Sequence, residues 1–176
     1  MKIFIKLLLL VLLSIPSFSD ENVMPLVSIR SLKSGILIAY EDNAKNLIDR
    51  NWRVKDIVLP YEIGKNYPFG AVQFVHPSMS NLCLALDGAK LTTMECSLIN
   101  VGDFRTAFSL LPTATSAVQI KAINDLNECL SMGNSRTGTS FSRMGLRSCE
   151  TDEKSDIILE NLFVLSVPIL DSKLVK

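Results

Sequence analysis

Ala71-Val72-Gln73-Phe74, followed by Cys83-Leu84-Ala85, returns later in the chain as Ala117-Val118-Gln119-Ile120, followed by Cys129-Leu130-Ser131. In both copies the valine precedes the cysteine by 11 residues, and the two copies are offset by 46 residues. A third copy without cysteine begins at Val27-Ser28-Ile29, which lies 45 residues before Val72 and its neighbours. Three related segments of this length predict a fold built by repetition of one supersecondary unit.

Each copy closes with an apolar run that ends in proline, at Pro60, Pro112 and Pro168. The copies, which begin at residues 27, 72 and 118, contain short apolar or alternating runs bounded by Asn, Asp, Gly, Ser and Pro, as is typical of β-strands. About four short strands in each of three copies predict an all-β fold, the closed β-trefoil, over residues 27–168. A two-sheet β-sandwich is the alternative that strand spacing alone allows.

The first 19 residues have the pattern of a cleaved signal peptide, with Lys2 and Lys6 before an apolar run and Ser17-Phe18-Ser19 at its end. The alternative, a membrane anchor, needs about 20 apolar residues, which is longer than this run. We therefore expect a secreted protein with short tails at residues 20–26 and 169–176. The chain has 18 basic and 18 acidic residues, and removal of Lys2 and Lys6 with the signal segment leaves a small acidic excess. This balance does not indicate a nucleic-acid binder.

The four cysteines follow the signal segment, so export would expose them to an oxidising compartment, where disulfides persist. Zinc sites use cysteines two to four residues apart, whereas these are separated by 13, 33 and 20 residues. Disulfides are therefore predicted. Cys83 and Cys129 occupy equivalent positions in the second and third copies. The register therefore predicts one bridge within each of these two copies, Cys83 to Cys96 and Cys129 to Cys149.

Catalytic chemistry has little support in the sequence. The single histidine, His76, precedes Pro77 in a Ser/Pro/Asn-rich stretch and is expected in a loop. Glu41-Asp42 and Asp152-Glu153 lie in polar stretches typical of solvated turns. Residues 133–138 are Gly-rich but lack the Lys-Ser/Thr ending of a phosphate loop. We predict a protein without catalytic residues, metal or cofactor. A trefoil glycosidase would need a spaced carboxylate pair that the sequence does not offer.

The aromatic residues divide into two groups. Trp52, Phe104, Phe108 and Phe163 lie in the alternating or closing runs and are expected in the core. Tyr61, Tyr67 and Phe69 instead cluster in a stretch interrupted by Pro60, Gly64, Pro68 and Gly70. Exposed aromatics on a loop favour a binding surface, so these three are candidate binding residues, with packing over the barrel end as the alternative.

Residues 27–32, 68–74 and 111–120 resemble the C subunits of bacterial cytolethal distending toxins, and the resemblance extends over nearly all of the chain after the signal segment. It implies a ricin B-type lectin fold and a non-catalytic role in a heterotrimeric AB-type toxin. In this family the A and C subunits bind the host cell and deliver the B subunit, a DNase I-like nuclease. The resemblance also implies that the N-terminal tail contacts the nuclease and that the host-membrane receptor contains a glycan or cholesterol.

Two features bear on what the resemblance implies. The Gln-x-Trp signature of ricin-type sugar sites is missing from the sequence, which argues against sugar binding at the usual positions. A sterol-recognition pattern, Leu/Val-x-Tyr-x-Lys/Arg with variable spacers, matches at Leu59, Tyr61 and Lys65. It also matches at Leu37, Tyr40 and Lys45, where the pattern overlaps a predicted strand over residues 35–39, so Tyr40 is expected to be packed. The first match is the candidate membrane loop. A stand-alone carbohydrate-binding lectin is the alternative function.

Overall fold

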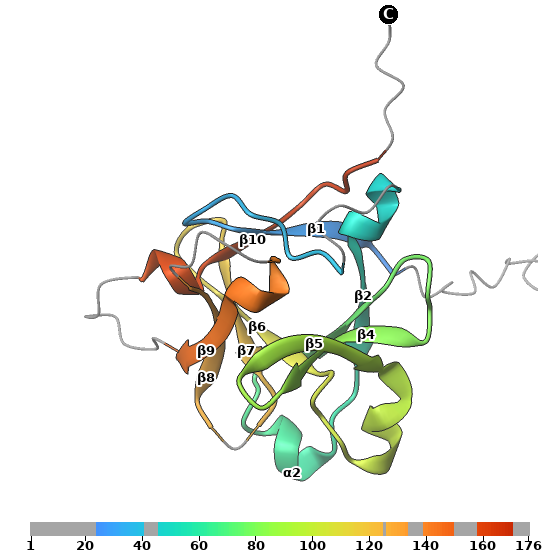
Figure 1. Cartoon of the computed structure of the whole chain (residues 1–176). Coiled ribbons are helices and arrows are strands. Elements are labelled where there is room, and N and C mark those ends of the chain that lie inside the picture. The colour runs from blue at the N-terminus through green and yellow to red at the C-terminus, as the bar shows by residue number, and fades with distance from the viewer. Residues whose placement is uncertain (1–23, 41–45, 125, 134–138, 150–157, 171–176) are drawn as a thin grey trace, which may run out of the picture.

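The chain folds into short antiparallel strands joined by turns and short helices (Figure 1). The computed structural model describes residues 24–40, 46–124, 126–133, 139–149 and 158–170. Within them the strands are β1 (Leu26–Ser31), β2 (Trp52–Ile57), β3 (Ala71–Val75), β4 (Leu82–Asp87), β5 (Lys90–Glu95), β6 (Phe108–Pro112), β7 (Val118–Ala122), β8 (Glu128–Met132), β9 (Met144–Ser148) and β10 (Phe163–Ser166). The helices are η1 (Leu47–Arg50), α2 (Tyr61–Gly64), η2 (Cys96–Val101), η3 (Phe141–Arg143) and η4 (Leu159–Asn161).

Six of these strands close into a barrel. Antiparallel pairing runs from β1 to β2, β3, β6, β7 and β10, and β10 pairs with β1 again. Each of the three sequence copies supplies two neighbouring positions of this ring, namely its first strand and its last. Closure leaves the barrel strands without the exposed edges of an open sheet. The predicted all-β fold with a closed barrel is therefore confirmed.

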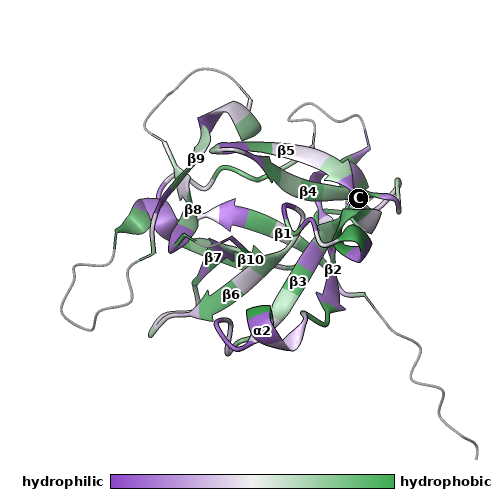
Figure 2. Cartoon of the chain, turned by 90° about the horizontal axis from the view of Figure 1, so that it is seen from below, coloured by the Kyte–Doolittle hydropathy of each residue, from purple (hydrophilic) through white to green (hydrophobic). Residues whose placement is uncertain are grey.

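The second and third copies each add a hairpin. Strand β4 pairs with β5, and Gly88 at the tight turn has a φ of 58°, a conformation that favours glycine. Strand β8 pairs with β9 in the same way. Figure 2 shows both hairpins on one side of the barrel and α2 on the opposite side. In the first copy the described residues show only an isolated bridge between Arg30 and Leu37, where a strand over residues 35–39 was predicted, and Tyr40, which was expected to be packed, is 38% exposed.

One large side chain from each barrel strand fills the barrel interior. These residues are fully buried, and they are Ile29, Trp52, Phe74, Phe108, Ile120 and Phe163. Burial of each side chain stabilises the fold by about 1.5–3 kcal/mol. The indole Nε1–H of Trp52 donates to the carbonyl oxygen of Ile38 at 2.7 Å, so its polar atom is also satisfied. The predicted core positions of Trp52, Phe108 and Phe163 are confirmed, whereas Phe104 is only half-buried and packs in a second, smaller cluster.

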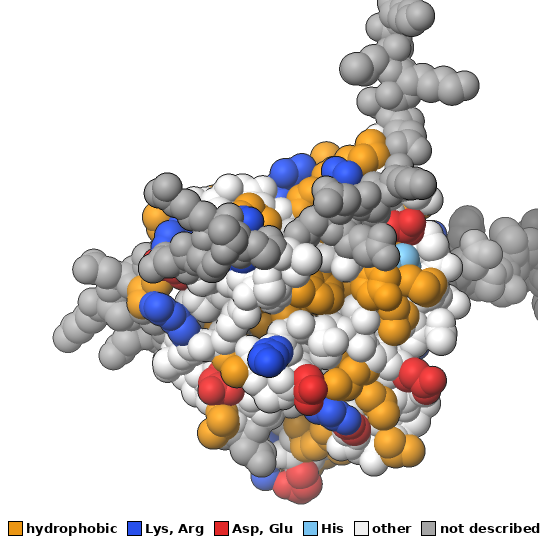
Figure 3. Space-filling model, in the orientation of Figure 1, with side chains coloured by type: hydrophobic (Ala, Val, Ile, Leu, Met, Phe, Trp, Pro, Cys, Tyr) orange, Lys and Arg blue, Asp and Glu red, His pale blue; other side chains and the backbone are white. Residues whose placement is uncertain are grey.

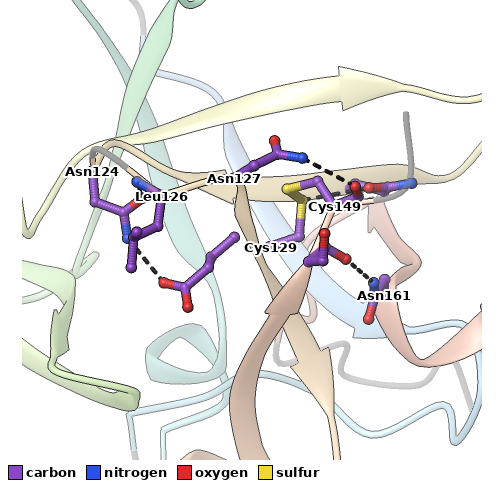
Figure 4. The surroundings of a disulfide bond; sticks show 9 residues. Asn124, Leu126, Asn127, Cys129, Cys149 and Asn161 are labelled. Atoms are coloured by element: carbon purple, nitrogen blue, oxygen red, sulfur yellow. Dashed lines mark hydrogen bonds between the residues drawn. A yellow bond between two sulfur atoms is a disulfide. The ribbon is translucent and has the colours of Figure 1, made fainter. Parts of the chain in front are cut away.

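Both predicted disulfides are present, Cys83 to Cys96 and Cys129 to Cys149. Figure 4 shows the second bridge and the asparagines around it. The Asn127 side chain donates to the carbonyl oxygen of Cys149 at 3.2 Å, and the Cys149 backbone N–H donates to the carbonyl oxygen of Asn127 at 2.9 Å. The bridge therefore lies at the open end of the β8–β9 hairpin, where the two strands would otherwise separate.

The two ends of the described chain meet beside η1. The Asn51 side chain is buried and exchanges two hydrogen bonds with the backbone of Ile169, each 2.8 Å long. The Val54 N–H donates to the carbonyl oxygen of Pro25 at 2.8 Å. The start of the predicted C-terminal tail is thus fixed to the barrel.

Several sequence predictions fall outside the described residues. These are the signal segment 1–19, most of both tails, Glu41-Asp42, Asp152-Glu153 and residues 134–138 of the Gly-rich stretch.

Candidate functional site

The link from β2 to β3 contains the candidate binding residues. After Ile57 the chain passes through Val58, Leu59 and Pro60 into the single turn of α2. The carbonyl oxygen of Pro60 accepts hydrogen bonds from the N–H groups of Ile63 and Gly64, at 3.0 and 2.8 Å. A further turn ends at Gly70, whose φ of 74° favours glycine, and β3 follows. The link is therefore an ordered, compact segment lying against the barrel.

The inner side of this link forms a second hydrophobic core. Tyr67, Ala71, Ala107 and Ile123 are buried there, and five half-buried apolar residues pack against them, namely Ile57, Leu59, Ile63, Ile99 and Phe104. These side chains come from the link, from η2 and its continuation, and from the ends of β3 and β7. This cluster fixes α2 in place on the barrel wall.

Tyr67 belongs to that core, so its prediction as an exposed binding aromatic is wrong. Only 7% of the residue is exposed. Its hydroxyl donates to the carbonyl oxygen of Asn124 at 2.6 Å, and the Lys121 ammonium lies 5.3 Å from the ring centre. The two partners come from the end of β7 and the segment after it, more than 50 residues away in sequence. Tyr67 therefore ties the link to the barrel.

The outer side of the link presents apolar side chains to solvent. Val58 is 96% exposed, Tyr61 82% and Phe69 58%. Val101, at the end of η2, and Leu126, after β7, are exposed at the same end of the molecule. We call these five residues the α2 surface. In Figure 3 hydrophobic side chains mixed with charged ones cover the lower end of the molecule, where α2 lies.

The three residues of the sterol-type pattern have different environments. Tyr61 projects into solvent, whereas Leu59 packs into the second core. Lys65 forms a 2.6 Å ion pair with Glu62 of the same turn, and both side chains are largely exposed. Because Tyr61 and Lys65 are four residues apart on one turn, they lie on the same face of α2. Of the pattern, Tyr61 and Lys65 are therefore accessible for contact, whereas Leu59 is packed.

Two hollows flank the link. One, of about 860 Å³, lies between α2 and the segments after η2 and β7, and it includes Tyr67, Lys121 and Leu126. The other, of about 740 Å³, runs along residues 55–60 and faces Cys96 and Asn100. Phe104 lies in the wall of both. The α2 surface is therefore uneven, with exposed apolar side chains beside two hollows that are lined by both polar and apolar residues.

A charged pair borders the larger hollow. The Arg105 guanidinium donates to both carboxylate oxygens of Asp103, at 3.0 and 2.6 Å. The Arg105 side chain, together with the Arg105 backbone N–H, lowers the pKa of the Asp103 carboxyl below its usual value. The pKa of Arg105 is raised in turn by Asp103. Both groups stay charged at neutral pH and leave this edge of the hollow without net charge.

The other candidate residues do not form a second site in the described part of the chain. His76 follows β3, as a loop position predicts, but it is buried. Within the described ranges, His, Cys, Asp and Glu side chains form no group of three that could hold a metal ion. No helix in the described part of the chain is long and apolar enough to cross a membrane.

Sequence reasoning missed three members of the α2 surface: Val58, Val101 and Leu126. Val58 lies in the apolar run Ile57-Val58-Leu59-Pro60, where no alternation distinguishes an exposed position from a packed one. Val101 precedes Gly102, whose φ of 81° ends η2 and leaves the valine at the turn. That glycine was the one available signal of a surface turn.

Comparison with known proteins identifies relatives of this architecture. Residues 26–173 match the protein family described as "Cytolethal distending toxin A/C domain". The fold is similar to a chain of the cytolethal distending toxin of Actinobacillus actinomycetemcomitans, with a TM-score of 0.65, 24% identity and coverage of 86% of this chain and 91% of the other. A chain of the Haemophilus ducreyi toxin gives a TM-score of 0.66, 22% identity and the same coverage.

A designed threefold-symmetric protein, ThreeFoil, is similar with a TM-score of 0.55 and 14% identity, over 80% of this chain and 97% of the other. At such identities these structures show the likeness of fold. A search of curated proteins finds no match to the sequence.

Proposed function

The chain belongs to the cytolethal distending toxin A/C domain family, and from this premise we propose that it is a non-catalytic, C-type binding subunit of a secreted heterotrimeric toxin. In this proposal it associates with an A-type subunit and a DNase I-like nuclease subunit and helps the assembly to bind host cells. The family match over most of the chain is the observation that carries the proposal.

We also infer that the barrel is a β-trefoil of the ricin B-lectin kind. Support comes from the three sequence copies, from the two strands that each copy gives to the barrel ring, and from the likeness to a designed threefold protein. A trefoil keeps its core within the barrel, so its links and hairpins are free to vary and to contact partners.

The α2 surface is the proposed contact region. Its exposed valines, leucine and aromatics are the kinds of side chain that stabilise an interface when they lose contact with water. We propose that Tyr61 and Phe69 contact either a sister subunit or the host membrane, where sterol recognition would use Tyr61 and Lys65. For this role we propose that the N-terminal segment, residues 1–19, is a signal peptide that directs the chain to the periplasm and then outside the cell.

Reconstitution tests the proposed role. The A-type and nuclease subunits are assembled with and without this chain, and cell binding and DNA damage are measured in treated cells. We expect both to fall strongly when the chain is left out. Full potency without it would refute the role, and saturable glycan binding by the isolated chain would favour a stand-alone lectin.

A further inference from the structure

His76, the only histidine of the chain, is buried in the turn between β3 and β4. The residue is 1% exposed. Its ring stands edge-on to the rings of Tyr40 and Trp52, with centroid distances of 5.2 and 6.1 Å. Histidine changes its charge near neutral pH, so a buried histidine makes its surroundings sensitive to mild acid.

The ring holds the turn together through one nitrogen. His76 Nδ1 accepts hydrogen bonds from the backbone N–H groups of Ser78 and Met79, at 3.2 and 3.1 Å. A ring nitrogen that accepts a hydrogen bond has no proton of its own, so the neutral ring has its proton on Nε2. The two bonds satisfy backbone donors that the turn leaves without a strand partner.

The same turn is tied to three neighbouring elements. The His76 N–H donates to the carbonyl oxygen of Leu82 at 2.8 Å, and the Leu82 N–H donates to that of Met79 at 2.9 Å. The Ser78 hydroxyl donates to a carboxylate oxygen of Asp49 in η1. The turn thus connects β3 to the first strand of the β4–β5 hairpin and holds both against η1.

We propose that the turn from His76 to Leu82 is an acid-sensitive latch that is closed while His76 is neutral. A second proton on the ring would occupy Nδ1 and place an N–H opposite the N–H groups of Ser78 and Met79. Both hydrogen bonds would be lost, and a positive charge would lie in a buried site between two aromatic rings. The turn relieves this by opening, which lets water reach the ring.

The charged and titratable groups around His76 come from few elements. Tyr40 contacts the ring, Asp49 binds the turn through Ser78, and Arg53 on β2 lies opposite Val75, the residue before His76. Glu41, Asp42 and Lys45 follow Tyr40 in the chain and lie outside the described residues. Among the described residues, His76 Nδ1 is the hydrogen-bond acceptor for the backbone N–H groups of Ser78 and Met79.

Opening changes the surface of the molecule locally. Tyr40, beside the turn, and Met79, within it, are exposed by 38% and 37%, and Figure 3 shows a hydrophobic patch next to the histidine. Movement of the His76 ring would uncover the side of Trp52 that it now faces. The disulfide from Cys83 to Cys96 keeps β4 attached to the start of η2, directly after β5, so the opening stays within the turn.

The sign of the pH dependence follows from linkage. An imidazole in contact with water takes up a proton at about pH 6.5, and the closed turn binds that proton more weakly than the open turn does. The free energy that favours the closed turn is therefore greatest above this pH and decreases as the pH falls below it. Between pH 7.5 and 5.5 the ratio of open to closed turn rises about tenfold.

Amide hydrogen exchange of the full chain, measured by NMR at pH 7.5 and 5.5, tests the latch. After correction for intrinsic exchange rates, protection of the Ser78 and Met79 amides should fall about tenfold at the lower pH. The pKa values of Asp103 and Glu160 are lowered by Arg105 and Lys33, so neither carboxyl titrates in this window. Protection that stays constant while the ring titrates would overturn the proposal.

His76→Asn is the matched variant, because its side-chain oxygen can accept from the same two N–H groups and does not titrate. In this variant the protection of the Ser78 and Met79 amides should be independent of pH over this range. A tenfold loss of protection equal to that of the native chain would overturn the latch. If the variant does not fold, imidazole ¹⁵N spectra of the native chain decide. A bare Nδ1 at pH 7.5 that gains its proton as the two amides lose protection supports the latch, and a protonated Nδ1 at pH 7.5 refutes it.

Discussion

Tyr61→Ala separates binding from folding at the α2 surface. The residue is 82% exposed, so little of its side chain packs against the rest of the fold. Its removal should therefore change the free energy of unfolding by no more than about 0.5 kcal/mol, as for most exposed positions. The melting temperature should stay within about 2 °C of the native value.

The expected loss of affinity follows from the exposed area. A tyrosine of this exposure offers about 200 Å² of mostly apolar surface, and a partner that covers half of it removes about 100 Å² from water. At about 25 cal/mol per Å² this contact contributes about 2.5 kcal/mol, which corresponds to about 60-fold in Kd. The affinity should be measured by calorimetry with the sister subunits and by sedimentation with vesicles that contain sterol.

Leu59→Ala is the matched control. Leu59 belongs to the same sterol-type pattern but packs into the second core, so its truncation should destabilise the fold by about 1–2 kcal/mol. That loss lowers the melting temperature by about 2–8 °C. If Tyr61→Ala binds subunits and vesicles with native affinity, the assignment of the α2 surface as a contact region is refuted. Loss of vesicle binding alone would identify the membrane as its partner.

Three further predictions concern the fold. Asn51→Ala removes four side-chain hydrogen bonds, two of them to Ile169, and should lower the free energy of unfolding in urea by about 2–4 kcal/mol. The control Asn66→Ala, at an exposed position, should leave it unchanged, and equal urea midpoints for the two variants would contradict this. Replacing both Cys129 and Cys149 by serine should cost about 3 kcal/mol, and a calorimetric midpoint that does not move would show that the bridge is dispensable. Arg105 lowers the pKa of Asp103, so the contribution of this pair to stability is present above about pH 4 and is lost as the pH falls through the lower pKa of the folded state. Asp103→Asn should therefore flatten the acid unfolding curve slightly in that range, and identical curves would refute the coupling.

The barrel was predictable because its signals are local or repeated. Short apolar runs ended by proline marked the strands, and the equal spacing from Val72 to Cys83 and from Val118 to Cys129 gave the register that predicts the disulfides. The burial of Tyr67 was not predictable in this way. Its partners, Asn124 and Lys121, are brought to it by the closure of the barrel, which no local pattern reports. The same holds for Val58, whose exposure depends on where α2 packs.

The asymmetry of the three copies explains how a repetitive fold obtains one distinct contact surface. The link from β6 to β7 spans only residues 113–117, whereas the equivalent link from β2 to β3 spans residues 58–70 and contains α2. Both links join neighbouring strands of the ring, so the barrel itself does not require the additional length. The longer link has its own small core, which holds Tyr67 inside and turns Tyr61 and Phe69 outward. Stability thus comes from the repeated barrel, and the surface that we propose for binding comes from the one link that departs from the repeat.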